Sequence, residues 1–352
     1  MRVRKPDYYD RFSCLAGACP DTCCAGWDVV VDKESLARYE ALDTPFGARV
    51  RAALTVDEDG DACFQTKDGF CPLLTAERLC SVQLELGEGA VCTVCRAHPR
   101  FIDEYGALRE ESLACSCPAA AALMLAGEAP AGFLAAENDE PEVDCDDVDR
   151  ALLEALIPCR ENAFALLQDR TQPLGERLAL LLEYARGLQD SLDEGDAAAL
   201  PGVPVPRSVE KADGSGVTGT LFETLRGLEI LSPKWLVLLE ETAGAGPCAR
   251  PAPDTGNETE YEHFAVYLTN RWFLKADFDG DVYAKAAFVC FACLALWSLE
   301  GRAPREELVR LWCKEMEHCQ ENMDALGELA CEVSPEELAG ALALRGETER
   351  PH

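Results

Sequence analysis

The sequence predicts a mainly α-helical protein that begins with a small cysteine-rich domain of short irregular elements and has no Rossmann sheet. Eleven of its 19 cysteines lie between Cys14 and Cys117. The rest of the chain is rich in Ala, Leu and Glu, which favour helices. No strand is followed by a Gly-rich loop and a helix, the order that a nucleotide-binding sheet requires.

Helix signals recur along the chain. Asp32 can cap a helix that runs to Ala41, and Gly87 ends one that begins at Ser81. Ser334 and Glu337 form a capping box before a helix. The other predicted helices are 116–126, 174–188, 221–230, 233–241, 261–273, 282–299 and 305–323.

Three regions follow from these signals. Residues 1–128 form the predicted metal or iron–sulfur domain, 129–218 a helical segment with linkers, and 219–350 a helical C-terminal domain. The linkers are the acidic stretch 135–149 and the Gly- and Pro-rich stretch 195–219, with a smaller one at 243–258.

Composition restricts the classes of protein. The 352 residues carry a formal charge of −32, and 48% are hydrophobic, as in a soluble globular protein. Such acidity argues against nucleic acid as a partner, because phosphates require clustered Lys and Arg. The longest apolar run, 286–297, is shorter than the ~18 residues that span a membrane, and residues 1–14 lack a signal-peptide core. We therefore expect a cytoplasmic protein with no membrane partner.

The cysteines indicate a metal centre. A reducing cytosol disfavours disulfides, so clustered thiols there more often bind metal or carry out redox chemistry. The first cluster places Cys14, Cys19, Cys23 and Cys24 within 11 residues, with Gly and Pro that let the backbone bend around an inorganic core.

The second cluster is more spread out. Cys71 and Cys80 precede a CxxC pair, Cys92 and Cys95, and Cys117 follows Cys115. CxxC spacing suits tetrahedral zinc as well as an iron–sulfur cluster, and thiol softness does not choose between them. The radical-enzyme triplet CxxxCxxC is absent from the sequence.

Longer stretches resemble the flagellin lysine-N-methylase family. The resemblance rests on FSCLAGACPDTCCAGWDVVVDKESLARY, CPLLTAERLCSVQLELGEGAVCTVCRAHPRF and ESLACSCPAAAALML, with EYEHFAVYLTNRWFLKADFDGDVYAKAAFVCFACLAL further on. The first part is also similar to the broader CxxCxxCC group of zinc- or iron-chelating proteins. Together these motifs cover most of the chain.

The resemblance implies a function and a set of ligands. It implies S-adenosylmethionine as the methyl donor, lysines of flagellin or of another Lys-bearing protein as the acceptor, and an iron–sulfur cluster of the 4Fe-4S type, with zinc as the second choice. A non-catalytic zinc- or iron-chelating or electron-transfer module is the alternative. Cys63, Cys92 and Cys115 are extra to the family pattern. The metal-ligating cysteines carried over are Cys14, Cys19, Cys23, Cys24, Cys71, Cys80, Cys95 and Cys117.

A four-iron cluster takes four thiolates, so eight candidates exceed its need. The first-ranked set is Cys19, Cys23, Cys71 and Cys95. The predicted helix 261–273 offers polar and aromatic groups that could orient a lysine amine, although core packing explains the aromatic ones as well. These residues are Tyr261, Glu262, Tyr267, Asn270, Arg271 and Trp272.

Overall fold

The computed structural model describes residues 1–57, 59–145, 147–244 and 258–346. The chain forms two compact units. The helical unit contains Met1–Asp10, Ile102–Ser112 and Ala121–His352, and the cysteine unit contains Arg11–Phe101 and Leu113–Ala120. Most of the expected linker 243–258 lies outside the described residues. The division into 1–128, 129–218 and 219–350 stays a prediction.

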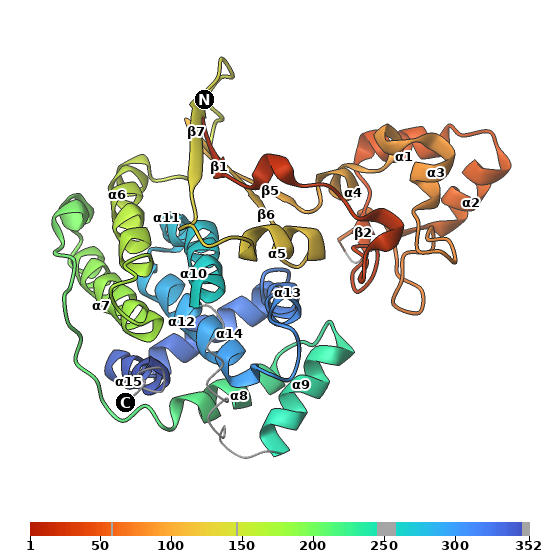
Figure 1. Ribbon diagram of the computed structural model, residues 1–352. Helices are drawn as coiled ribbons and strands as arrows, with labels where there is room; N and C mark the ends of the chain where they lie inside the picture. Colours follow the sequence, from red (N-terminus) through yellow and green to blue (C-terminus); the bar gives the residue numbers. More distant parts are fainter. Residues whose placement is uncertain (58, 146, 245–257, 347–352) are drawn as a thin grey trace. The chain divides into compact units, whose positions relative to one another are not determined.

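The cysteine unit is built from short elements (Figure 1). Its three-stranded sheet has the order β2-β4-β3, with β4 antiparallel to both neighbours. The elements are η2 Ala16–Ala18, β2 Val29–Val30, α1 Lys33–Glu40, α2 Pro45–Ala53, β3 Leu54–Val56, β4 Ala62–Phe64, α3 Ser81–Leu86, η3 Glu88–Ala90 and α4 Thr93–Ala97; η1 Tyr9–Arg11 and α5 Pro118–Leu125 lie where the chain passes between the units.

Asp32 joins two of these helices. Its carboxylate accepts a hydrogen bond from the backbone N–H of Ser35, which caps α1 as expected, and another from the N–H of Thr93, which begins α4. The two backbone hydrogen bonds hold the pKa of Asp32 well below its ordinary value, and the bond from Thr93 has the larger effect. One side chain therefore fixes the start of α4, the helix that carries Cys95.

The helical unit contains the long helices that the sequence predicted, with two differences. The expected helix 305–323 is two helices, α13 and α14, because the chain leaves helical geometry between Met316 and Gln320. Helix α6 was not predicted. The helices are α6 Arg150–Leu167, α7 Leu174–Asp193, α8 Val217–Gly227, α9 Pro233–Gly244, α10 Glu258–Trp272, α11 Ala276–Asp279, α12 Val282–Leu299, α13 Arg305–Met316, α14 Gln320–Glu332 and α15 Pro335–Gly346, with the 3-10 turns η4 Ala197–Gly202 and η5 Phe273–Lys275.

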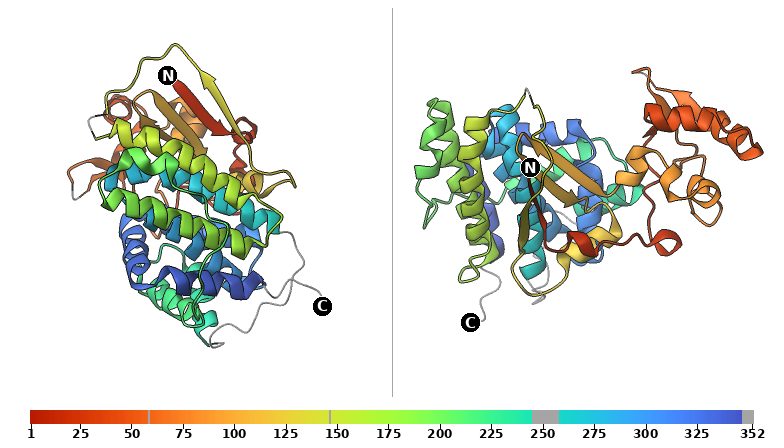
Figure 2. Two further views of the ribbon diagram at one scale, coloured as in Figure 1. Left: turned by 90° about the vertical axis from the view of Figure 1, so that its left-hand side faces the viewer. Right: turned by 90° about the horizontal axis from the view of Figure 1, so that it is seen from above.

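Helix α12 is the centre of the helical core. It contacts α7, α10, α13 and α14, and α7 also contacts α6 and α15 (Figures 1 and 2). Within the described residues, α12 alone is long and apolar enough to cross a membrane, and 78% of it is buried inside the protein. This is weak evidence for a membrane span, because core helices have the same composition.

A four-stranded sheet belongs mainly to the same unit. Its order is β5-β6-β1-β7, formed by Arg100–Tyr105, Leu108–Leu113, Arg2–Pro6 and Phe133–Glu137. Strand β1 is parallel to β6, with Arg2 opposite Leu108, and antiparallel to β7. Among the residues that the structure describes, neither sheet contains a run of parallel strands with crossover helices, so the expectation of a fold without a Rossmann sheet is confirmed.

Arg4 attaches this sheet to the helices. Its guanidinium donates to Asn270 Oδ1 at 2.7 Å and lies 3.9 Å from the ring centre of Phe133. Burial, followed by the nearby charge of Arg160, lowers the pKa of Arg4 to about 10. Arg160 itself donates two hydrogen bonds of 2.5 Å to the Glu110 carboxylate on β6. Polar contacts therefore hold β1 and β6 against α6 and α10.

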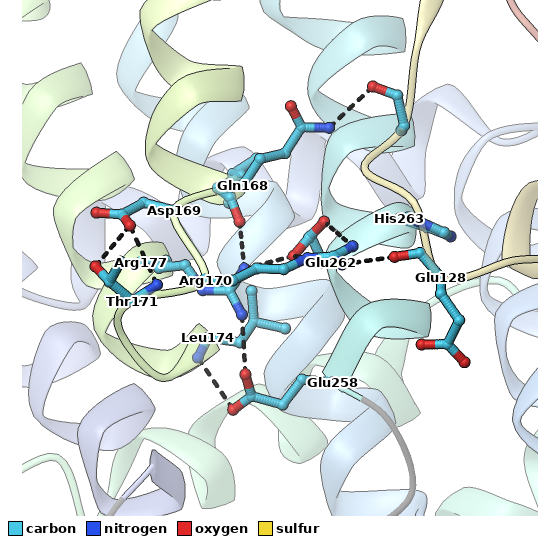
Figure 3. Close-up of polar contacts among 12 residues, drawn as sticks. Glu128, Gln168, Asp169, Arg170, Thr171, Leu174, Arg177, Glu258, Glu262 and His263 are labelled. Atoms are coloured by element: carbon cyan, nitrogen blue, oxygen red, sulfur yellow. Dashed lines mark hydrogen bonds and ion pairs between the residues drawn. The ribbon is translucent and has the colours of Figure 1, made fainter.

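A second buried network centres on Glu262 of α10 (Figure 3). Arg170 contributes two hydrogen bonds of 2.8 Å to its carboxylate, and Arg177 contributes one of 2.7 Å. Arg177 also donates to Glu258 and to the carbonyl of Leu167, where α6 ends. Burial opposes ionisation of Glu262, but the two arginines outweigh it and hold its pKa below the ordinary value. The network ties α10 to the connection between α6 and α7.

Replacing Arg177 with Met removes one partner from a fully buried carboxylate. We expect the free energy of unfolding to fall by about 3–5 kcal/mol, because the remaining charge stays buried. The matched control is Arg186→Met on the same helix, where a half-exposed pair with Glu183 is worth less than about 1 kcal/mol. Urea unfolding measures both, and equal losses in the two variants would contradict this account.

Glu315 of α13 links that helix to the connection between α8 and α9. Its side chain is fully buried and accepts from the backbone N–H groups of Leu231 at 2.7 Å and Ser232 at 2.8 Å. Burial is the main cause that raises the pKa of Glu315 to about 7, against 4.5 for an ordinary glutamate. Between pH 4.5 and about pH 7, the Glu315 carboxyl is therefore protonated in the folded protein but already ionised in the unfolded chain.

This difference predicts a pH dependence. As pH rises from about 4.5 to about 7, the contribution of Glu315 to stability falls, because ionisation becomes costly only in the folded state. Glutamine does not ionise, so Glu315→Gln lacks this pH-dependent part of the unfolding free energy. The wild type should therefore lose more stability than the variant between pH 5 and pH 7.5. Urea unfolding at both pH values tests the difference, and parallel slopes for the two proteins would rule it out.

Candidate metal centre

The eight cysteines of the family pattern all lie in the cysteine unit, and we divide them into two sets for description. We call Cys24, Cys71, Cys80 and Cys95 the inner thiols, and each is partly buried. We call Cys14, Cys19, Cys23 and Cys117 the outer thiols; Cys14 and Cys23 are exposed, and the other two are partly buried. The four first-ranked cysteines take two from each group.

Backbone pairing brings three inner thiols together. The N–H of Cys71 donates to the carbonyl of Cys24 at 2.7 Å, so two distant parts of the chain meet at these residues. The turn after Cys71 is closed by the N–H of Leu74, which donates to the Cys71 carbonyl at 3.1 Å. Leu74 in turn forms an antiparallel bridge with Cys80. Cys24, Cys71 and Cys80 therefore lie on neighbouring segments.

A hydrophobic cluster supports the inner group. Cys71, Cys80 and Cys95 pack against buried residues that include Tyr39 and Val82. Tyr39 is fixed by a hydrogen bond of 2.8 Å from its hydroxyl to the carbonyl of Ala90. The thiols thus have an apolar side, which limits water access and favours metal–sulfur bonds over hydrated thiolates.

The thiols influence each other's ionisation. A hydrogen bond with Cys23, and then burial, raises the pKa of Cys24 far above its ordinary value, and Cys71 and Cys80 raise it further. Burial raises the pKa of Cys71 as well. A hydrogen bond with Cys92 is the main cause that raises the pKa of Cys95. Without a cation, burial and mutual repulsion keep these thiols protonated, and a bound metal would displace their protons.

Cys92 is a thiol that the family pattern left out. Its side chain is buried, and its Sγ lies 3.3 Å from Sγ of Cys95. The hydrogen bond with Cys95 lowers the pKa of Cys92 to about 7, so this pair retains one shared proton. The CxxC spacing was the signal for it. Cys63 and Cys115, the other extra cysteines, are buried.

The outer group is assembled around a short turn. The 3-10 turn η2 separates Cys14 from Cys19, and the N–H of Ala16 donates to Cys14 Sγ at 3.3 Å. Burial raises the pKa of Cys117 to about 11, with additional electrostatic contributions from Cys19 and Cys14. Cys19 likewise interacts with Cys14 and Cys23.

The donor set fits a soft metal. Thiolates are the ligands that zinc and iron–sulfur clusters prefer, and each group offers the four that either centre takes. Within the described residues, no three His, Cys, Asp or Glu side chains already have a geometry that would hold a metal ion. Binding would therefore require the thiols to turn toward a common point.

The α10 residues named as candidates for orienting a lysine make contacts inside the helical unit. The Tyr261 hydroxyl bonds to Glu300, Tyr267 and Trp272 both donate to Glu317, and Arg271 pairs with Asp103. Glu262 and Asn270 belong to the two networks described above. The interpretation that this face packs and stabilises the core therefore explains these residues.

Comparison with known proteins found curated relatives. A stretch of 124 residues, 34% of this chain, is 32% identical to a lysine-N-methylase of Salmonella typhimurium and covers 31% of that protein; the lysine-N-methylase of Salmonella choleraesuis is similar at 31% over 130 residues. The chain thus matches about a third of the length of these enzymes. The flagellar biosynthetic protein FliU of Salmonella muenchen is 32% identical over 130 residues, which are 73% of FliU.

No family model matches the chain, and no solved structure matches it. The match between this chain and FliU covers most of FliU. The match between this chain and the lysine-N-methylase of Salmonella typhimurium has a similar length. The resemblance to the lysine-N-methylases is therefore confirmed, but over about a third of the chain, whereas the motifs had suggested that it covers most of it. The chain belongs to the family of the lysine-N-methylases and FliU.

Proposed function

We propose that this protein is a protein-lysine N-methyltransferase that uses S-adenosylmethionine, acts on flagellin, and carries an iron–sulfur cluster. The observation that carries the proposal is its family membership, since two of its relatives are named lysine-N-methylase and the third is a flagellar biosynthetic protein. The cysteine unit supports the cofactor part, because its inner thiols lie on neighbouring segments against an apolar surface.

Methyl transfer to lysine is a nucleophilic displacement. The nitrogen–carbon bond forms as the carbon–sulfur bond of the sulfonium breaks, and the electron pair of that bond stays on sulfur. The lysine must first lose a proton, because only the neutral amine has a lone pair. The reacting nitrogen and carbon must also be held in line at about 3 Å. An enzyme contributes by orienting both substrates and accepting the proton.

The cluster would be held by the inner thiols in this proposal. An iron–sulfur cluster supplies redox chemistry or a fixed structural core. The chain's own contribution is to deliver four thiolates from three segments, with Asp32 fixing the start of the helix that carries Cys95. The apolar residues behind these thiols exclude water from that side.

Anaerobic purification tests both parts of the proposal. We expect a brown protein with about four iron and four sulfide per cluster, which transfers methyl groups from S-adenosylmethionine to lysines of flagellin from the same source. Iron and sulfide analysis measures the first part, and mass spectrometry of flagellin measures the second. Flagellin with acetylated lysines is the matched control, since it offers no free amine.

Each of the other results of this purification would contradict one part of the proposal, either the reaction or the cofactor. A brown protein that neither binds S-adenosylmethionine nor methylates flagellin would favour the electron-transfer or chelating alternative. A colourless zinc protein that methylates flagellin would replace the proposed cofactor and leave the reaction standing. A protein without bound metal would overturn the cofactor assignment.

Charge should help the enzyme to find its substrate. At −32, the protein attracts surfaces that present lysine, and salt screens this attraction within about 10 Å at 0.1 M. We expect the association rate with flagellin to fall roughly tenfold between low and high ionic strength. Stopped-flow binding measures the rate, and acetylated flagellin should show a weaker dependence. A flat salt response of unmodified flagellin would contradict the role of charge.

A further inference from the structure

We infer that the outer edge of β7 is a docking site for an extended, lysine-bearing segment of a protein partner, which adds a strand to the four-stranded sheet. This inference rests on the proposed function, because the partner that we assign is the lysine-bearing substrate, and it deepens that function by naming where the substrate binds. Strand addition uses the backbone groups of an unpaired edge for affinity and nearby side chains for specificity.

The pairing of β7 with β1 fixes which backbone groups are free. Strand β7 lies at one end of the sheet order β5-β6-β1-β7, so β1 is its one neighbour in the sheet (Figures 1 and 2). The Gly132 carbonyl accepts from the N–H of Asp7 at 2.9 Å, and the N–H of Asn138 donates to the Met1 carbonyl at 3.0 Å. Backbone groups along a strand alternate in direction, so every second residue between these two also faces β1. The residues whose N–H and C=O groups face away from β1 are therefore Phe133, Ala135 and Glu137.

This edge is open within the part of the chain that the structure describes. The residues from Leu134 to Glu137 are all exposed, and the Leu134 side chain keeps 50% of its surface accessible. No described segment donates a hydrogen bond to the outward backbone groups of Ala135 or accepts one from them. The free groups are therefore available to a partner.

The opposite edge of the sheet, at β5, is treated differently. The segment that follows β7 lies against the end of β5, where the N–H of Val143 donates to the Gly106 carbonyl at 3.1 Å. The Sγ of Cys145 donates to the carbonyl of Glu104, within β5, at 3.6 Å. The chain thus covers part of one edge and leaves the other open.

The sequence of β7 lacks the features that usually protect an exposed edge. Lysine, proline and bulges keep edge strands from pairing with other chains. The strand FLAAE contains neither lysine nor proline, and its register with β1 runs from Phe133 to Glu137 without a break. An unbroken edge of this composition favours pairing with another strand.

The strand is held in place from its inner side. The ring of Phe133 stacks on Phe164 of α6, with ring centres 5.0 Å apart. Just before the strand, the Gln168 side chain donates to the Ala131 carbonyl at 2.9 Å. A preformed edge loses little conformational entropy when a partner strand is added, which favours binding.

Charge indicates which kind of segment fits. Residues 137–149 include eight acidic side chains and no basic one. The two that pair with arginines are Glu140 and Glu142. Glu137 and Asp139 are exposed, and although Arg2 lies opposite Glu137 in the register, no ion pair joins these two described residues. Carboxylates at the end of the open edge favour a partner strand that carries lysine.

Two substitutions test the backbone and the charge separately. Ala135→Pro removes the central outward N–H and leaves the hydrogen bonds with β1 in place, as edge strands tolerate. Glu137→Lys reverses the charge at the end of the edge. Glu194→Lys is its matched control, because this exposed residue at the end of α7 undergoes the same change of charge outside the sheet. Circular dichroism identifies folded variants, and if Ala135→Pro does not fold, Glu137→Lys and its control decide the result.

Fluorescence anisotropy of labelled probes measures binding to the full chain. The probes are monomeric flagellin from the same source, a synthetic peptide of alternating lysine and valine, and the same peptide with every second amide N-methylated, which removes the hydrogen-bond donors of one strand edge.

We expect Ala135→Pro to bind flagellin and the unmethylated peptide about tenfold more weakly than the wild type does. Glu137→Lys should weaken binding roughly threefold or more, and Glu194→Lys much less. The N-methylated peptide should bind the wild type weakly. Deuterium exchange of residues 133–137 should slow when the unmethylated peptide is bound.

The failures are distinguishable. Equal affinity of the wild type and Ala135→Pro for the unmethylated peptide overturns the docking site, as does equal weakening by Glu137→Lys and Glu194→Lys, which would assign the attraction to net charge. Methylation of flagellin by Ala135→Pro with an unchanged KM overturns this inference and leaves the proposed function standing. Absence of methylation by a wild type that binds the peptide at this edge overturns the function and supports the docking site.

A second copy of the chain is the other occupant that an open edge admits. Analytical ultracentrifugation of the free protein tests it. We expect the wild type and Ala135→Pro to have the same oligomeric state. A wild-type dimer that Ala135→Pro converts to a monomer would assign the edge to a second copy and overturn the lysine-bearing partner.

Discussion

The cost of placing several thiolates side by side against an apolar wall governs the cysteine unit. Cys24, Cys71 and Cys95 all have a raised pKa in the absence of metal, because burial and neighbouring thiols oppose ionisation. A soft cation reverses this balance by replacing repulsion with metal–sulfur bonds. The unit has few long elements and one small sheet, so bound metal would add stability that its core alone supplies only in part.

In the helical unit the buried charges are carboxylates, and arginine side chains pair with them. Glu262 is fully buried, and two guanidinium groups hold it ionised. Glu110 is buried as well; it forms an ion pair with Arg160 and lies 3.5 Å from Arg4. Glu262 belongs to α10, and its contacts with Arg170 and Arg177 stabilise the packing of the unit. In this unit, buried charged side chains stabilise the packing of helices and strands.

Much of this fold could be predicted from local patterns. The caps at Asp32 and Ser334 depend only on neighbouring residues, and both are present. The four-stranded sheet could not be predicted, because β1 pairs with residues more than a hundred positions away and its sequence RVRKP lacks strand alternation. Similarly, spacing identified the cysteines but not which segments meet: only the folded chain joins Cys24 to Cys71, through a backbone hydrogen bond.

The central claim is that sulfur from this chain surrounds an inorganic iron centre. X-ray absorption at the iron edge of anaerobically purified protein tests it most directly, because the method reports the atoms bound to iron. The account predicts a first shell of sulfur alone, with iron–iron scattering from a cluster. Iron bound by nitrogen or oxygen, or a preparation without iron, would contradict it.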